Sequence, residues 1–303
     1  MPIPLAYIGV VLIWSTTPLA IAWSGDAAGF IFGVSSRMLL GLILIFIFAT
    51  IMQTKLVWHK KARLAYIYGG LGIYASMLAV YWSAQQIPSG WISVLFGLTP
   101  IFSAIMASFW LENEHLTRHR MSGISLGLIG LLVVFGSSLS LNETAILGVL
   151  GVILSGVIHS ASAIWVKRVH AQVSAISMTA GSLLVATPLF VLTWLCTQPG
   201  FAETQQILSH APNYTLIAIA YLALFGSVFG FSLYFFVLKH VQATRVALIS
   251  LITPITSLML GHYFNHEVIT LNIIIGAGLI IAGLALFELG GKPLPKWVPF
   301  RPN

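Results

Sequence analysis

The distribution of lysine and arginine constrains this chain more than any other feature of its sequence. All but one of its 14 Lys and Arg residues fall in alternate connections between long apolar runs. They are Lys55, Lys60, Lys61, Arg63, Arg118, Arg120, Lys167, Arg168, Lys239, Arg245, Lys292, Lys296 and Arg301. Because cytoplasmic loops collect Lys and Arg, the pattern predicts a multi-pass protein of the inner (plasma) membrane with both termini in the cytoplasm.

The composition excludes a water-soluble globule. The chain has 303 residues, of which 58% are hydrophobic and only 7% are charged, too few to cover a soluble surface. The net charge of +7 is spread over short loops and is explained by topology, so nucleic-acid binding is not predicted.

The sequence carries no enzymatic signature. It contains no HExxH, GxSxG or P-loop motif, and its single cysteine, Cys196, excludes an internal disulfide and a multi-cysteine metal or redox site. We therefore expect neither an enzyme, nor a cofactor, nor a metal centre.

With about 20 residues needed to span a bilayer, the apolar runs predict ten transmembrane helices. Their ranges are 4–24, 30–52, 63–84, 89–111, 120–138, 145–166, 174–196, 214–238, 243–263 and 269–289. The predicted fold is an all-α polytopic membrane protein with a single transmembrane domain over 1–303.

An internal repeat divides this domain. The tripeptide Leu-Thr-Pro at 98–100 recurs as Ile-Thr-Pro at 252–254, and the match extends further with one single-residue gap. The paired residues are Glu114 with Glu267, Gly123 with Gly276, and Gly130 with Gly283. Five helices in each half, 1–140 and 141–303, make the second half enter the membrane from the opposite side. Inverted repeats of this kind place a substrate site at the midplane and permit alternating access.

These features resemble the drug/metabolite transporter superfamily in its ten-helix form with two EamA-type halves. The resemblance covers nearly the whole chain and is most specific over 97–130 and its repeat at 252–283. The Trp-Ser-Thr-Thr-Pro segment at 14–18, followed by Arg37, is similar to the YddG-type exporters of aromatic and neutral amino acids. The resemblance implies an exporter, although the superfamily also includes nucleotide-sugar and organic-phosphate exchangers.

Two ionisable residues lie inside predicted spans. Arg37 is a candidate for binding a substrate carboxylate, because a charge at that depth is costly unless it is paired or hydrated. The alternative is a structural role, in which Arg37 pairs with backbone carbonyls or with a carboxylate such as Asp26. His159 is either a hydrogen-bonded core residue or a proton carrier.

Pro100 and Pro254 occupy equivalent positions in the two halves. Each removes a backbone hydrogen bond from its helix, so we expect hinges beside the substrate site; static kinks are the alternative. The glycines at 123, 127, 130, 276 and 283 form small-residue stripes that predict close helix packing.

Deep aromatic residues are candidates for the walls of the substrate site. They are Trp14, Tyr74, Tyr81, Trp82, Tyr221 and Tyr234. Such walls suit an apolar or aromatic side chain, or a flat cation held by cation–π attraction; ordinary packing is the alternative.

No acidic residue lies in the middle of a predicted span, so proton exchange on a membrane carboxylate is not expected. Glu114 and Glu267 are expected near opposite membrane faces, as helix-end caps or as gate partners of nearby His and Arg residues.

The sequence thus predicts an exporter of neutral amino acids, aromatic ones included, that works by alternating access. Its partners are the amino-acid substrate and membrane lipid, and a monomer suffices. An exporter of organic cations such as methyl viologen is one alternative, and a non-transporting scaffold or sensor is another.

Overall fold

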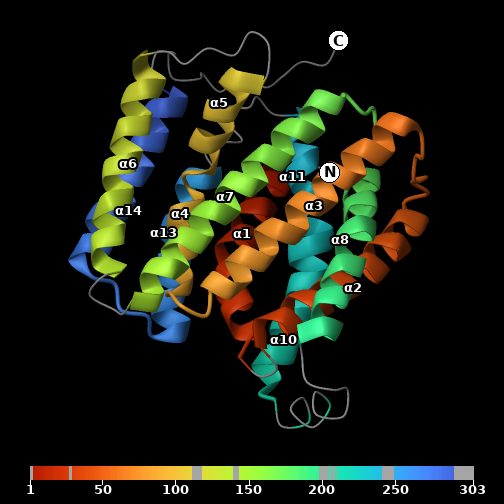
Figure 1. Cartoon of the computed structure of the whole chain (residues 1–303), viewed down its shortest axis with the longest axis horizontal. Coiled ribbons are helices and arrows are strands. Elements are labelled where there is room, and N and C mark those ends of the chain that lie inside the picture. The colour runs from red at the N-terminus through yellow and green to blue at the C-terminus, as the bar shows by residue number, and fades with distance from the viewer. Residues whose placement is uncertain are drawn as a thin grey trace.

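The computed structural model describes residues 3–26, 29–110, 118–138, 143–197, 205, 209, 211–240 and 249–289, and all its extended elements are helices (Figure 1). The first half contains α1 (Ile3–Ser24), α2 (Gly29–Ile51), α3 (Lys60–Ser83), α4 (Ser89–Phe96), α5 (Thr99–Trp110) and α6 (Arg118–Ser138). The second half contains α7 (Glu143–Val169), α8 (Ala175–Thr197), α10 (Asn213–Tyr221), the π-helix η1 (Leu222–Phe229), α11 (Gly230–His240), α13 (Ile249–Asn265) and α14 (Leu271–Leu289).

These elements form ten apolar helical passes, because α4 with α5, and α10 with η1 and α11, each make one. Seven stretches of the described chain are long and apolar enough to cross a membrane, including Ser89–Trp110 and Asn213–Leu233. The pass boundaries lie within a few residues of the predicted ones wherever the structure describes them. The predicted all-α, multi-pass membrane fold is confirmed.

The described basic residues outside the spans gather at one end of the bundle. The starts of α3 and α6 and the end of α7 lie at the upper end in Figure 1, and they carry Lys60, Arg118 and Arg168. The connections that follow α1, α3 and α13 lie at the opposite end and contain no Lys or Arg. We refer to these as the basic end and the basic-free end.

The two equivalent prolines have different backbone surroundings. The helical pattern is interrupted at Gly97 and Leu98, and Pro100 becomes the second residue of α5, where a missing N–H costs nothing. In contrast, α13 continues through Pro254. The two prolines therefore differ in local structure, because one helix is interrupted before its proline and the other only loses a hydrogen bond. Their role as hinges stays a prediction.

The pass predicted over 214–238 also departs from a regular helix. Its middle eight residues, Leu222–Phe229, form the π-helix η1. Short π-helical segments inside α-helices are rare and occur often at functional sites. No sequence pattern predicted this one.

The glycine stripes hold α6 and α14 together at backbone distance, side by side in Figure 1. A Cβ atom added to Gly123 would lie 2.6 Å from the Gly283 carbonyl oxygen, and one on Gly130 would lie 2.7 Å from that of Gly276. Only glycine permits this approach, so the packing role predicted for the stripes is confirmed.

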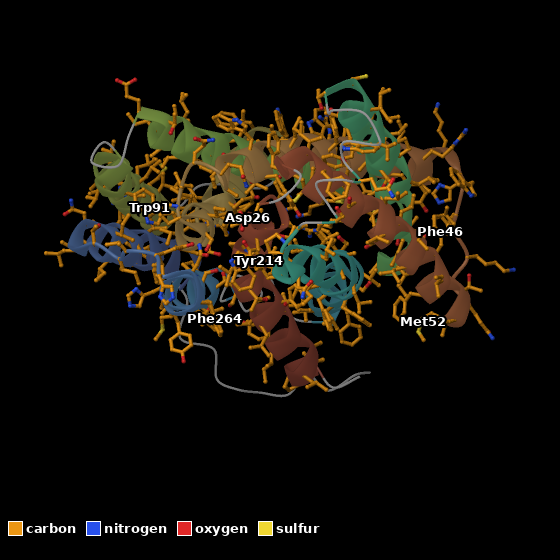
Figure 2. The ribbon with its side chains drawn as sticks, turned by 90° about the horizontal axis from the view of Figure 1, so that it is seen from below. Asp26, Phe46, Met52, Trp91, Tyr214 and Phe264 are labelled. Atoms are coloured by element: carbon orange, nitrogen blue, oxygen red, sulfur yellow. The ribbon has the colours of Figure 1, made fainter. Side chains whose placement is uncertain are left out.

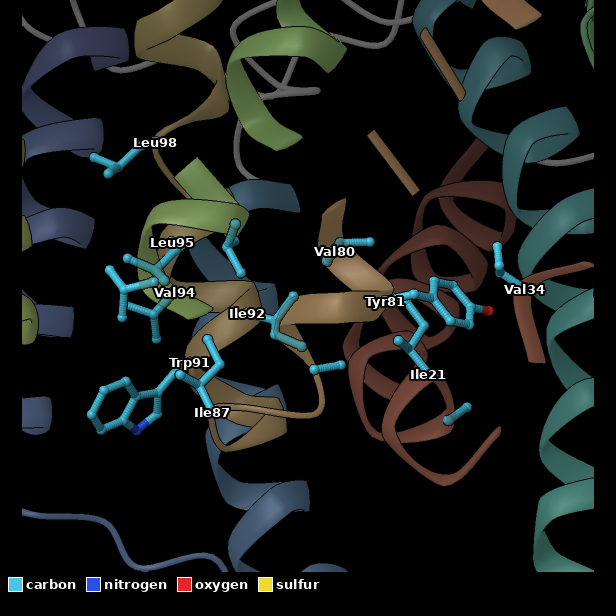
Figure 3. Packing of buried hydrophobic residues seen from close by; sticks show 14 of the residues in the cluster. Ile21, Val34, Val80, Tyr81, Ile87, Trp91, Ile92, Val94, Leu95 and Leu98 are labelled. Atoms are coloured by element: carbon cyan, nitrogen blue, oxygen red, sulfur yellow. The ribbon is translucent and has the colours of Figure 1, made fainter. Parts of the chain in front are cut away.

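The main hydrophobic core runs through the bundle, from α1 to α4 and from α7, α8 and η1 to the contact of α6 with α14. Figure 3 shows Tyr81 between the side chains of α4, such as Ile92, and Val34 on α2. Its ring is fully buried. This core fixes the position of the Tyr81 hydroxyl.

Candidate functional site

Arg37 lies at the junction of α2, α3 and η1 with only 2% of its surface exposed. Its Nε donates a hydrogen bond to the Ser227 hydroxyl oxygen at 3.1 Å. Its Nη1 donates to the Tyr81 hydroxyl oxygen at 3.2 Å. The guanidinium is thus held by side chains from both halves of the chain.

Glycines create the space for this arrangement. A Cβ atom on Gly226 would lie 2.9 Å from Nη2 of Arg37, and one on Gly41 would lie 3.0 Å from Cβ of Ser227. The π-helical turn therefore presents Ser227 to the guanidinium while Gly226 leaves the Nη2 side without a side chain.

No carboxylate among the described residues forms an ion pair with Arg37. Asp26, a candidate partner from the sequence, instead accepts a hydrogen bond from Tyr214. Both partners of Arg37 are neutral, and their hydrogen bonds use two of the five N–H donors of a guanidinium. A buried charge without a counter-ion is costly, by several kcal/mol in real proteins. The site therefore has both the donors and the electrostatic preference for an anionic group.

The other aromatic candidates are distributed over several interfaces. Trp14 packs beside α11. A Cβ atom added to Gly230 would lie 3.7 Å from the indole Nε1 of Trp14. Gly230 follows Gly226, which borders Arg37, by about one helical turn. Tyr221 forms a hydrogen bond with the Thr16 hydroxyl at 2.6 Å, which ties α10 to α1.

Tyr74 and Trp82 have partners other than Arg37. The Tyr74 hydroxyl is 2.7 Å from that of Thr193 on α8, and its ring packs edge-on against Phe190. Trp82 packs against α7 at Gly151. These positions favour packing roles for both. The side chain of Tyr234 lies outside the described part of the structure.

His159 is half-buried on the inner face of α7. Leu147, Leu150 and Leu154 are exposed on the lipid side of this helix. At 3.6 residues per turn, Ala163 lies on the opposite side of the helix, yet it is also exposed. The inner face of α7 is thus accessible near the basic end, and His159 lies one turn deeper on that face.

The start of α5 lies against α7 near Ser160. The Ser160 hydroxyl donates a hydrogen bond to the Thr99 carbonyl oxygen at 3.2 Å. The hydroxyl oxygen of Thr99 is buried and has no partner among the described residues. The helix interruption beside Pro100 therefore brings an unused polar group into the bundle interior.

Hydroxyl groups also join α1, α4 and α13. The Ser257 hydroxyl donates to the Ser15 carbonyl oxygen at 2.6 Å and accepts from Ser93 at 2.9 Å. The Ser15 and Thr256 hydroxyls are also hydrogen-bonded. Isolated serines and threonines in apolar helices gave no signal in the sequence, and Ser227 was missed for the same reason.

Comparison with known proteins matches this sequence to membrane transporters. The EamA-like transporter family matches residues 1–136 and 146–289. The uncharacterized transporter YoaV of Bacillus subtilis (strain 168) is 28% identical over 285 residues, which cover 92% of this chain and 94% of YoaV.

A probable amino-acid metabolite efflux pump of Salmonella typhimurium (strain LT2) is 26% identical over 240 residues, covering 77% of this chain and 80% of the pump. Its namesake in Escherichia coli (strain K12) is 26% identical over 208 residues, covering 67% and 69%. A solved crystal structure of a protein that is 19% identical covers 94% of this chain and 96% of its own, with a TM-score of 0.66, a likeness of fold alone.

Proposed function

We propose that this chain, which belongs to the EamA-like transporter family and is a membrane transporter, exports neutral amino acids, aromatic ones included, from the cytoplasm. Two relatives named as probable amino-acid metabolite efflux pumps support the substrate class. The observation that carries the proposal is the buried guanidinium of Arg37, whose described partners are both neutral.

A substrate carboxylate would supply the charge that Arg37 lacks. Two parallel N–H groups of a guanidinium match the two oxygens of a carboxylate, and such charge-assisted hydrogen bonds are about twice as strong as neutral ones. The same positive charge opposes an organic cation at this position. Arg37 therefore favours amino acids over flat cations as substrates.

The surroundings of Arg37 suit the rest of an amino acid. Tyr81 and Trp14 provide apolar rings, and the hydroxyls near them provide acceptors for an ammonium group. Burial against these rings stabilises an aromatic or aliphatic side chain of the substrate. A charged substrate side chain would have no counter-ion among the described residues.

Alternating access between the halves 1–140 and 141–303 is the mechanism that we propose. The two stretches matched by the family fall one in each half, which supports this division. At the basic-free end α4 packs on α13 and α1, whereas α5, beyond the interruption at Gly97, packs mainly on α7. In the proposed mechanism, with the basic end in the cytoplasm, this arrangement corresponds to the inward-facing state.

Pro100 and Pro254 serve as hinges in this mechanism. The interruption before Pro100 separates the part of the pass that closes the basic-free end from the part that diverges at the basic end. A Cβ atom on Gly97 would lie 3.7 Å from Cγ of Pro254, so the two proline-bearing passes meet at the interruption. Bending at this contact would move one half relative to the other.

The test is efflux from proteoliposomes that hold the purified protein, with a panel of neutral amino acids and methyl viologen, with and without a pH gradient. We expect saturable efflux of neutral amino acids that needs no pH gradient and that Arg37→Ala abolishes. Transport of methyl viologen alone would support the alternative hypothesis, an exporter of organic cations. Equal loss of both substrates in Arg37→Ala would assign Arg37 a structural role.

A further inference from the structure

The connection between α13 and α14 lies over the start of α4 at the basic-free end. The helix α4 begins after Pro88, whose side chain has no acceptor for the first N–H groups of the helix. Glu267 supplies the missing acceptor. Its Oε1 accepts from the Ser89 N–H at 2.8 Å and from the Ser89 hydroxyl at 2.6 Å, and its Oε2 accepts from the Gly90 N–H at 3.1 Å.

This cap joins two regions that are 178 residues apart and belong to different halves. Helix N-termini attract carboxylates because their N–H groups are unpaired and the helix dipole is positive there. A capping residue normally belongs to the same helix. Here the stabilisation of α4 depends on how the second half is positioned.

A chain of side-chain contacts extends from the cap across the same end. The Asn265 amide donates to Oε1 of Glu267 at 3.0 Å, and its oxygen accepts from the Trp23 indole at 3.1 Å. The Trp23 ring packs on Tyr214 at 5.8 Å, and Tyr214 donates to Asp26. Figure 2, which views this end, shows Asp26 and Tyr214 next to each other near the centre.

Close packing continues beneath the cap. A Cβ atom on Gly90 would lie 2.9 Å from Cα of Leu258, so α4 and α13 are in backbone contact there. One turn deeper on α4, Ser93 is buried and hydrogen-bonded to Ser257. Access from the basic-free end to the level of Ser93 therefore requires α4 and α13 to separate, which breaks the cap.

We propose that Glu267 is a gating residue of transport: its cap on Ser89 and Gly90 holds the basic-free end closed and is released each time that end opens. The proposal rests on the alternating access proposed above but not on the identity of the substrate. An ordinary structural cap would stay in place throughout the cycle.

The test compares the accessibility of two introduced cysteines in a Cys196→Ala background. Ser93→Cys reports opening at the basic-free end, and Ala163→Cys reports the inner face of α7 near the basic end. The purified protein is placed in lipid nanodiscs without substrate, and the rate of reaction with a membrane-impermeant maleimide is measured with and without Glu267→Gln.

Glu267→Gln should speed labelling of Ser93→Cys by about tenfold, the effect of losing a good helix cap. It should also slow labelling of Ala163→Cys, because opening one end closes the other. The matched control is Glu143→Gln at the exposed start of α7, which removes the same charge near the same end and should change neither rate.

Two results would overturn the proposal. Unchanged labelling of Ser93→Cys would mean that the cap does not hold the gate. Faster labelling at both positions would mean that Glu267 only stabilises the fold. If Glu267→Gln does not yield folded protein, Ser89→Ala removes one donor to the cap and should give the same pattern with smaller changes. Substrate efflux is measured separately, so a wrong substrate assignment leaves these outcomes unaffected.

Discussion

Nη1 of Arg37 on α2 donates a hydrogen bond to the Tyr81 hydroxyl on α3, 3.2 Å away, and both side chains are buried. We expect Tyr81→Phe to leave the guanidinium less well oriented. A hydrogen bond to a charged group contributes about 1.5–3 kcal/mol, so the KM for neutral amino acids should rise by about tenfold or more. The measurement is concentration-dependent efflux from proteoliposomes.

Tyr74→Phe is the matched control, because the Tyr74 hydroxyl bonds to Thr193 and not to Arg37. It should leave the KM within about twofold of wild type if its hydrogen bond is structural only. Equal effects of the two substitutions would contradict a specific role for Tyr81.

Arg37→Met separates a binding role from a structural one. An unbranched apolar side chain of similar length removes a buried charge whose described partners are neutral, and an unpaired buried charge costs several kcal/mol. We therefore expect thermal unfolding in detergent at a temperature no lower than that of wild type, together with loss of amino-acid efflux. A clear drop in that temperature would indicate that Arg37 mainly supports the fold.

The α6–α14 contact depends on glycine at specific positions. A Cβ atom on Gly283 would lie 2.6 Å from the Gly127 backbone nitrogen, whereas one on Gly278 of the same helix would meet nothing within 4 Å. Gly283→Ala should destabilise the protein by about 1–3 kcal/mol through overpacking. Gly278→Ala should be neutral or slightly stabilising, because alanine favours helix. Thermal unfolding of both variants tests this, and equal effects would contradict it.

The orientation can be tested with two exposed positions in a Cys196→Ala background. Val268 lies at the basic-free end with 74% exposure, and Lys55 lies at the basic end. In intact cells an impermeant thiol reagent should label Val268→Cys and spare Lys55→Cys, because basic loops stay in the cytoplasm. The reverse pattern would place the termini outside.

Asp26 gives the stability of the basic-free end a defined pH dependence. Desolvation raises the pKa of its carboxyl above the ordinary value of 3.8, and the hydrogen bond from Tyr214 partly opposes this. Folding favours the neutral form of Asp26, so the contribution of this group to stability is greatest at pH below 3.8 and is lost as pH rises through its folded pKa. The difference in unfolding temperature between wild type and Asp26→Asn, measured across this range, should follow that trend. A constant difference would contradict it.

The sequence by itself determined the helical passes, the asymmetry of basic residues and the close packing of the glycine-bearing helices. These depend on properties that each segment carries alone. Twenty apolar residues span a bilayer whatever their neighbours are, lysine is costly in hydrocarbon, and a row of glycines leaves a groove on any helix. Arg37 could be singled out for the same reason, because the free-energy cost of a charged side chain inside a membrane span is evident from its position in the sequence.

The tertiary structure alone decided which groups meet. Membrane helices that are apolar on all sides give little indication of the face that turns inward, so neither Ser227 as a partner of Arg37 nor Ser89 as a partner of Glu267 could be read from the chain. The repeat gives Pro100 and Pro254 equivalent positions in the sequence, yet one follows an interruption and the other lies within a continuous helix. Packing against different neighbours distinguishes two prolines whose own chemistry is identical.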